Sequence, residues 1–363
     1  MSINSVSTTL TDTPLGRTIA ETATDIWNDS CALDELEYAV AFGAVGATAN
    51  PTIVVDNWKA DPDRWAGRVR ELADAEPTFS ERELAWGIVA EMSVRAAPLL
   101  LPAFEASGGR AGRLSVQTDP TLYRDAPAMV TQAFGFSGLA PNIIVKFPTT
   151  VAGVAAMEEA SYQGISVNAT VSFSVAQALA AAEAVQRGIS RREADGHDTS
   201  DMGPVITIMM GRTEDWLRVV AEREGLILDP AALAWSGVAV FKRAYGEWQH
   251  HGFRARLLGA AIRHQLHWSE LIGGDVVITM PSSWQKRFNA SSVEVRSRIG
   301  DPVPYLDELG RLPDFVRAYE PDGLSLAEFD TWGPTVRTLR AFIASYHELL
   351  HMVSDAMLPN PDS

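Results

Sequence analysis

The sequence predicts an α/β fold in the form of a single-domain (β/α)₈ TIM barrel, and three observations lead to this prediction. About eight short apolar or β-branched runs are typical of buried strands, and most of them precede a helical pattern. Such alternation favours a parallel sheet with helical crossovers. Eight of these units need about 250 residues, which the 363-residue chain exceeds. An open doubly wound sheet is the alternative, but no glycine-rich phosphate loop follows the first strand.

The first half of the predicted barrel is recognised from apolar runs that end at polar or turn-forming residues. Asn50-Pro51 marks a turn after the second strand. Asp61 is expected to cap a long helical stretch that Pro77 divides into two helices. The expected strands are 26–29, 44–48, 114–117 and 142–149, with helices at 34–42, 62–104, 120–134 and 150–163.

The second half repeats the pattern, and glycines are expected to end or interrupt its helices. Gly188 would end the helix that starts at Ser174, and Gly237 would interrupt the helix over 229–250. The polar stretch 190–203 is predicted to be a surface loop. The expected strands are 165–171, 205–210, 255–260 and 276–280, with a further helix from Thr213 and another that Gly273-Gly274 closes.

Outside the predicted barrel, which spans residues 25–281, the chain has additions at both ends. Residues 1–24 are expected to form a mobile leader and the start of a helix. Residues 282–363 are expected to form an irregular, proline-containing segment and then a helix from about Gly333 to Met357 that packs on the barrel. No internal repeat and no linker indicates a second domain.

Composition restricts the class of function. The net charge is −16 and the pI about 4.9, so the chain lacks the basic excess that nucleic-acid binding needs. The single Cys31 rules out an internal disulfide framework and suits a reducing compartment. The polar N-terminus lacks the apolar core of a signal peptide, and no uninterrupted apolar run approaches the roughly 20 residues of a membrane span. We therefore expect a cytoplasmic protein without nucleic-acid or membrane partners.

Lys146 is the residue around which the chemistry is predicted. It follows three β-branched residues of a buried strand, and it is one of only four lysines among thirty basic residues. A desolvated lysine can lose its proton and act as a neutral nucleophile, whereas arginine stays protonated. Such amines form Schiff bases with carbonyl substrates. The alternative is a lysine that snorkels from the strand end to solvent.

Polar residues lie at or just beyond the end of almost every predicted strand, at the rim where barrel enzymes place their sites. Each of them can be a simple turn-former or helix cap. Together they provide an acid, an amine, several amides and hydroxyls, and two arginines, which suits carbonyl chemistry on an anionic sugar. They are Asp29, Thr48, Asn50, Gln117, Lys146, Asn168, Thr170, Thr207, Arg212 and Arg263.

The stretch 145–177, VKFPTTVAGVAAMEEASYQGISVNATVSFSVAQ, resembles the transaldolase signature with its Schiff-base lysine. GATANPT at 46–52 is similar to the family's VTTNPS turn, and WND at 27–29 is similar to its first strand with a catalytic aspartate. Two further stretches, 207–212 and 259–263, resemble the family's phosphate-binding elements. The matches follow the family order across most of the predicted barrel.

This resemblance implies a transaldolase-like transferase that moves a dihydroxyacetone unit from a ketose phosphate to an aldose phosphate without a cofactor. It implies that Lys146 forms the Schiff base and that Asp29 is the acid/base. The oligomeric state stays open, a homodimer included. The other implied roles are Asn50 and Asn168 for substrate hydroxyls with Thr48 on the same rim, Thr170 for the catalytic water, and Thr207, Arg212 and Arg263 for the phosphate.

Three positions depart from the family pattern. Gln117 stands where the family has a glutamate, and glutamine can orient a water but cannot accept its proton. Related aldolases that release dihydroxyacetone also carry glutamine there, so this activity is the alternative. Thr207 replaces a phosphate-binding serine, and Ile208 or Met209 replaces an aromatic residue.

A second motif, HELLH at 347–351, matches the H-E-x-x-H pattern of zinc hydrolases. On a helix, His347 and His351 would share a face. Only twelve residues follow the motif, so a third ligand would have to be Asp355 or come from a distant part of the chain. The apolar residues around the motif also fit a helix docked on the barrel. We expect no metal, and a zinc hydrolase is the remote alternative.

Overall fold

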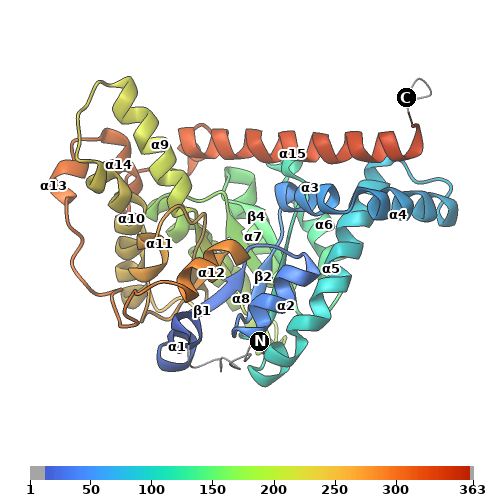
Figure 1. Ribbon diagram of the computed structural model, residues 1–363, viewed down its shortest axis with the longest axis horizontal. Coiled ribbons are helices and arrows are strands. Elements are labelled where there is room, and N and C mark those ends of the chain that lie inside the picture. The colour runs from blue at the N-terminus through green and yellow to red at the C-terminus, as the bar shows by residue number, and fades with distance from the viewer. Residues whose placement is uncertain (1–12, 360–363) are drawn as a thin grey trace, which may run out of the picture.

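A closed barrel of eight parallel strands forms the centre of the protein (Figure 1). The structure, a computed structural model, describes residues 13–359. The strands pair in sequence order, and β8 closes the barrel by pairing with β1. In this pair Asp25 lies opposite Val277 and Asn28 lies opposite Met280. The predicted barrel is therefore confirmed, and the open sheet is wrong. The strands are β1 (Asp25–Asn28), β2 (Gly46–Thr48), β3 (Arg113–Gln117), β4 (Ile143–Pro148), β5 (Val167–Thr170), β6 (Val205–Ile208), β7 (Arg256–Gly259) and β8 (Val276–Met280).

Helices follow most of the strands and surround the barrel (Figure 1). Of the leader and helix expected at residues 1–24, residues 1–12 lie outside the described residues, and α1 begins at Pro14. The helices are α1 (Pro14–Glu21), α2 (Leu33–Ala41), α3 (Pro51–Ala60), α4 (Pro62–Ala75), α5 (Glu81–Ala106), α6 (Ala126–Ser137), α7 (Val151–Tyr162), α8 (Val175–Ala194), α9 (Met210–Arg223), α10 (Pro230–His251), α11 (Leu266–Ser269), α12 (Ser282–Asn289), α13 (Leu306–Leu309), α14 (Pro313–Tyr319) and α15 (Gly333–Met357), with 3₁₀ turns η2 (Pro120–Leu122) and η3 (Leu326–Glu328).

Two helices continue through glycines that the sequence analysis interprets as breaks. Helix α8 runs past Gly188 and takes in the start of the expected surface loop, and α10 runs through Gly237 without interruption. A Cβ atom on Gly188 would lie 2.2 Å from the carbonyl oxygen of Glu158, and one on Gly237 would lie 2.4 Å from that of Met210. Both predictions were wrong because these glycines allow close backbone packing between elements.

Prolines begin helices at several places where the sequence suggests turns or irregular chain. Pro51 is the first residue of α3, which the pattern does not predict, and Pro313 begins α14 within the segment expected to be irregular. Pro120 opens only the 3₁₀ turn η2, and α6 starts later. The first helical turn accepts proline because its N–H groups have no partner within the helix. Pro77 does separate α4 from α5, as predicted.

The interior of the barrel has an apolar layer below a polar one. Trp27, Ile144, Val205, Leu258 and Val277 pack together inside the barrel. Gly46 faces this layer, because a Cβ atom there would lie 2.4 Å from the indole ring. One step further along the strands, the inward positions carry hydroxyl, amide and charged groups. The apolar layer therefore lies on the side of the polar layer that is away from the C-terminal rim.

Helix α15 runs across this rim, from α9 toward α3, α4 and α5 (Figure 1). Its Thr335 hydroxyl accepts a hydrogen bond from Gln177 Nε2 at 3.2 Å. Farther along, Ser345 Oγ lies 2.9 Å from Thr52 Oγ1 of α3. The helix therefore adds residues from the end of the chain to a site built mainly by the barrel.

Helix α5 is the one helix in the described part of the chain that is long and apolar enough to cross a membrane. This finding concerns length and composition alone, and half of its most apolar window is buried. The buried side packs against β3, α4 and α15. A core helix of a barrel passes the same test, so the finding is weak evidence for a membrane span.

Candidate active site

A cavity of about 560 Å³, its open side included, lies at the C-terminal rim of the barrel. Eight of the ten predicted site residues line it, whereas Gln117 and Asn168 do not. Leu258 of β7, Ala260 just after it and Thr279 of β8 also line it. The eight are Asp29, Thr48, Asn50, Lys146, Thr170, Thr207, Arg212 and Arg263.

Lys146 is a buried amine in the wall of this cavity, with 6% of its surface exposed. Its Nζ donates a hydrogen bond to the carbonyl oxygen of Ala49 at 3.2 Å. Burial lowers its pKa to about 8, although the charges of Asp29 and Cys31 oppose this shift. The snorkelling alternative does not describe this side chain, and a substantial share of the amine is neutral near pH 8.

Asp29 directly follows β1, and its carboxylate belongs to the same cavity as the lysine. Thr48 Oγ1 donates a hydrogen bond to Asp29 Oδ1 at 2.6 Å. The backbone N–H of Asp29 donates to the carbonyl oxygen of Met280, which ties the residue to the end of β8. The strands on both sides of β1 therefore hold this carboxylate.

Asn168 is fully buried and has its amide engaged by neighbouring strands. Its Nδ2 donates to Ser115 Oγ at 2.9 Å, and its Oδ1 accepts from Thr207 Oγ1 at 2.8 Å. In the strand register it lies beside Lys146. Asn168 thus links β3, β5 and β6 and holds Thr207, which itself lines the cavity.

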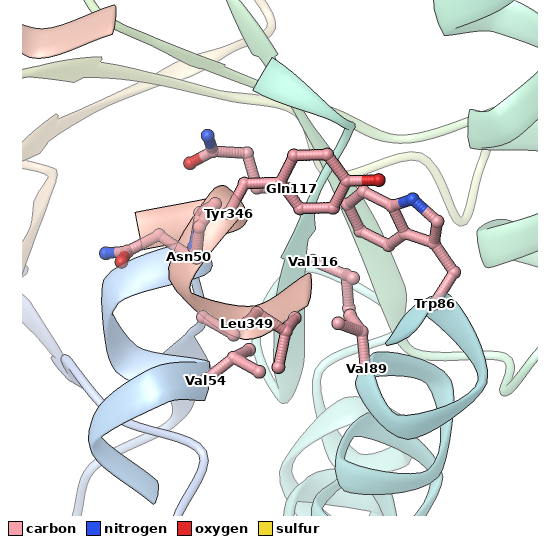
Figure 2. A pocket seen from close by; sticks show the side chains of 10 residues that line it. Asn50, Val54, Trp86, Val89, Val116, Gln117, Tyr346 and Leu349 are labelled. Carbon is pink, nitrogen blue, oxygen red and sulfur yellow. The ribbon is translucent and has the colours of Figure 1, made fainter. Parts of the chain in front are cut away.

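Gln117 lines a second, smaller cavity of about 290 Å³ next to the first. Figure 2 shows it beside Tyr346 of α15, with Trp86 of α5 and Asn50 of α3 around the same space. Its Oε1 is buried and has no hydrogen-bond partner among the described residues. Gln117 is the register neighbour of Lys146, and Asn50 lines both cavities. The amide is therefore close to the lysine strand but walled by apolar and aromatic groups.

Asn50 also has a structural role at the start of α3. Its Oδ1 accepts a hydrogen bond from the backbone N–H of Ile53 at 3.0 Å, as an N-cap does. This cap fixes the side chain at the rim, where it faces both cavities.

Arg212 and Arg263 form a positive end of the main cavity. The guanidinium carbon of Arg212 lies 5.3 Å from the ring centre of Phe342, a contact of cation–π type. Burial and the charge of Arg263 lower the pKa of Arg212, which still stays protonated. Arg263 Nη2 donates to Asp215 Oδ2 at 2.9 Å. Two guanidinium groups with one carboxylate partner provide an anion site.

The backbone is strained at two positions close in sequence to residues that line the main cavity. Val171 follows Thr170 and has φ 52°, and Ala261 precedes Arg263 by two residues and has φ 63°. A β-branched residue in the left-handed region is a true outlier. Gly211 allows the tight turn near Ala261, because a Cβ atom there would lie 1.9 Å from the Ala261 carbonyl oxygen. Strain of this kind clusters at functional sites.

Phe342 is a wall residue that no sequence pattern places in the site, and Met209, noted from the resemblance only as a replacement for an aromatic residue, also lines the cavity. Phe342 belongs to α15, where its spacing predicts only a packing face. It supplies an aromatic ring beside Arg212, although Ile208 and Met209 replace the aromatic residue expected from the resemblance. No local pattern could assign it, because only the path of α15 across the rim brings it there.

The HELLH motif lies on α15, with His347 and His351 on the exposed surface. Glu348 is paired with Lys59 Nζ at 2.7 Å. The interior face of the same turns carries Tyr346 and Leu349, which line the smaller cavity. This geometry gives no support to the zinc-hydrolase alternative.

Comparisons with known proteins agree with the geometry. Residues 26–312 match the family described as Transaldolase/Fructose-6-phosphate aldolase. A transaldolase from Thiobacillus denitrificans is 29% identical over 347 residues, which cover 86% of this chain and 90% of that protein. One from Neisseria meningitidis is 30% identical over 292 residues, or 72% and 80% of the two chains. The match to a transaldolase from Thermobifida fusca, 31% identical over 205 residues, covers 54% of this chain and 55% of that protein. The family match across most of the barrel, together with these relatives, shows that the chain is an enzyme of the transaldolase/fructose-6-phosphate aldolase family.

Proposed function

We propose that this enzyme transfers a dihydroxyacetone unit from a ketose phosphate to an aldose phosphate through a Schiff base on Lys146. The observation that carries the proposal is a buried lysine of lowered pKa in one cavity with a carboxylate and two arginines. A neutral amine, a proton acceptor and an anion site are the groups that this reaction needs. The substrates are sugar phosphates, and the proposed location is the cytoplasm.

The reaction begins when the neutral amine of Lys146 attacks the C2 carbonyl of the ketose phosphate. Loss of water gives a protonated imine, which withdraws electrons from the neighbouring carbons. Asp29 then accepts the proton of the C4 hydroxyl, the C3–C4 bond breaks, and its electrons form an enamine on the lysine. The aldose phosphate leaves, and an acceptor aldehyde takes its place and reverses the steps. Water finally adds to the imine and releases the product ketose.

The residues around the lysine have supporting roles in this scheme. Thr48 would orient the Asp29 carboxylate through their 2.6 Å hydrogen bond. Asn50 would bind a substrate hydroxyl at the rim. Asn168, whose amide is already engaged by Ser115 and Thr207, would act on the substrate mainly by holding Thr207. Thr207, Arg212 and Arg263 would bind the phosphate, and Phe342 would cover it.

Gln117 and Thr170 are proposed to hold the water that hydrolyses the imine. An amide orients this water but cannot accept its proton, so Asp29 would have to do so. Slow hydrolysis leaves the enamine waiting for an aldehyde, which is transferase behaviour. The second candidate function is an aldolase that releases free dihydroxyacetone, and glutamine at position 117 is the observation that favours it.

Borohydride trapping tests the proposal directly. Reduction in the presence of fructose 6-phosphate is expected to add the sugar-derived mass to the peptide that contains Lys146. Labelling of Lys242 or Lys286 instead, or of no peptide, would contradict the mechanism. Turnover of fructose 6-phosphate with and without erythrose 4-phosphate then separates the two functions, since only a transferase needs the added aldehyde.

A further inference from the structure

A cluster of one glutamate and two histidines, in which only His264 is partly exposed, lies behind the arginine end of the cavity. Glu214 comes from α9, His264 follows Arg263 along the chain, and His267 belongs to α11. One ligand atom from each lies within 4.8 Å of the other two. His264 Nε2 is 2.7 Å and His267 Nε2 is 3.2 Å from Glu214 Oε2. None of these three residues has a role in the reaction proposed above.

The hydrogen bonding of His267 argues against a metal ion in this cluster. The backbone N–H of Arg263 donates to His267 Nδ1 at 3.2 Å, so Nδ1 carries a lone pair. A neutral ring then has its proton on Nε2, the nitrogen that faces Glu214. A metal on Nε2 would require a proton on Nδ1, directly opposite the N–H of Arg263. Burial lowers the pKa of His267, which keeps the ring neutral at neutral pH.

Glu214 is the fixed charge of the cluster. Burial raises its pKa, but hydrogen bonds with His264 and Arg218, together with the His267 ring 3.2 Å away, outweigh this effect and hold the pKa well below its usual range. The carboxylate therefore stays ionised and lies 3.2 Å from Nε2 of His267. The opposite edge of the ring then presents Nδ1 to the backbone of Arg263.

We propose that His267 is a positioning residue for anion binding, acting through the backbone of Arg263. The inference rests on the proposed function, in which Arg263 binds the substrate phosphate. Arg263 comes two residues after the strained Ala261, and its side chain is 41% exposed. Without the hydrogen bond to His267, the loop could relax and move the guanidinium away from Arg212. The contacts that lead from Glu214 to His267 and from His267 to the backbone of Arg263 therefore set the geometry of the anion site.

Calorimetric titration of the full-length protein with inorganic phosphate tests this inference without relying on the transfer reaction. His267→Leu removes the acceptor and is expected to weaken phosphate binding about three- to tenfold, as for the loss of one hydrogen bond. His267→Asn keeps an acceptor at the position of Nδ1 and is expected to bind phosphate nearly as the wild type does. Arg263→Met weakens binding by itself, and adding His267→Leu to it is expected to have no further effect.

Three results would overturn the inference. These are equal losses in His267→Leu and His267→Asn, additive losses in the double variant, and no phosphate binding by the wild type. Stoichiometric zinc in the purified protein would identify the cluster as a metal site instead. If His267→Leu does not fold, as judged by thermal unfolding, Glu214→Gln is the substitute, because it keeps the shape and removes the orienting charge. Borohydride trapping of the sugar on Lys146 is measured in parallel. Absence of trapping in the wild type would contradict the proposed function, whereas the phosphate titrations test the role of His267.

Discussion

The two ends of the active-site cavity are built from different parts of the fold. At one end, Lys146, Thr170 and Thr48 lie on barrel strands, and Lys146 is 6% exposed. At the other end, Arg212 and Arg263 follow the strands. The side chain of Arg263 is 41% exposed and donates a hydrogen bond to Asp215. The proposed reacting groups are thus positioned by strand register, whereas the proposed anion site depends on a strained loop and two helices. In the proposed mechanism, the chemistry takes place at the end built from strands, here called the rigid end, and the substrate phosphate binds at the other, here called the adaptable end.

Burial also has opposite consequences at the two ends. It lowers the pKa of Lys146 to about 8, so a large share of the amine is neutral near that pH. It lowers the pKa of Arg212 as well, but a guanidinium remains protonated throughout the physiological range. The same physical effect therefore yields a neutral amine at one end and a permanent cation at the other.

The largest effect is expected from Lys146→Arg at the rigid end. Arginine keeps the charge but cannot become a neutral nucleophile, so turnover is expected to fall by at least about 10³-fold and trapping to disappear. The matched control, Lys286→Arg, makes the same exchange at a lysine outside the cavity and should retain full activity. Residual trapping in Lys146→Arg would assign the Schiff base to another lysine.

A smaller effect of a different kind is expected from Arg212→Met at the adaptable end. Loss of charge-assisted hydrogen bonds to phosphate is worth about 1.5–3 kcal/mol, so the KM for a phosphorylated acceptor is expected to rise about 10- to 100-fold. The KM for unphosphorylated glyceraldehyde should barely change. Arg187→Met, at a surface ion pair with Glu158, is the control. Equal losses with both acceptors would show that the arginine acts on the chemistry rather than on the phosphate.

The pH dependence distinguishes the ends without any substitution. Because the folded pKa of Lys146 is about 8, its neutral fraction rises about tenfold from pH 7 to pH 9. The single-turnover rate of imine formation should rise in proportion, while phosphate binding by the arginines should not. A rate of imine formation that does not change from pH 7 to pH 9 would mean that the amine is already neutral at pH 7.

Folding stability should also depend on this lysine. The unfolded chain keeps the proton of Lys146 up to a higher pH than the folded chain does, so the lysine makes the free energy of unfolding increase with pH between about 8 and 10.5.

Thr48→Val probes the carboxylate of the rigid end. Valine preserves the shape but removes the hydrogen bond to Asp29, which is worth about 1 kcal/mol. We expect kcat to fall about fivefold with KM unchanged. Thermal unfolding serves as the control, because a loss of stability with unchanged kcat would make the contact purely structural.

The smallest effect is expected from Gln117→Glu beside the lysine strand. A carboxylate can accept a proton from the hydrolytic water, so the ratio of free dihydroxyacetone to transfer product is expected to change about two- to threefold. Product analysis with fructose 6-phosphate and erythrose 4-phosphate measures this ratio. An unchanged ratio would mean that Gln117 does not hold the catalytic water.

Strand-end residues were the part of the site that local pattern could identify. Lys146 and Asp29 lie near the ends of apolar runs, Thr207 lies within another, and parallel strands carry such positions to one rim. Asn168 was predicted on the same grounds, yet its amide is engaged by Ser115 and Thr207 and does not line the cavity. The pattern specifies which residues reach the rim but not which hydrogen bonds they make there, because partners come from strands distant in sequence.

Helix predictions failed where packing rather than propensity decided the outcome. Gly188 and Gly237 look like breaks, but both lie within helices where a neighbouring carbonyl leaves no room for a Cβ atom. Pro51 looks like a turn and instead begins α3. Glycine and proline have several roles each, and the sequence alone does not say which role applies.

The amino-acid sequence by itself determined the alternation of strands and helices, the barrel that follows from it, and the lysine at the end of an apolar strand. These features depend on local periodicity and on the handedness of strand–helix–strand units. Only the tertiary structure decided that α15 crosses the rim, that Phe342 covers Arg212, that Gln117 lies in a separate cavity and that His267 faces the backbone of Arg263. These contacts join residues from separate elements, and their geometry depends on how whole helices pack, which no local pattern records.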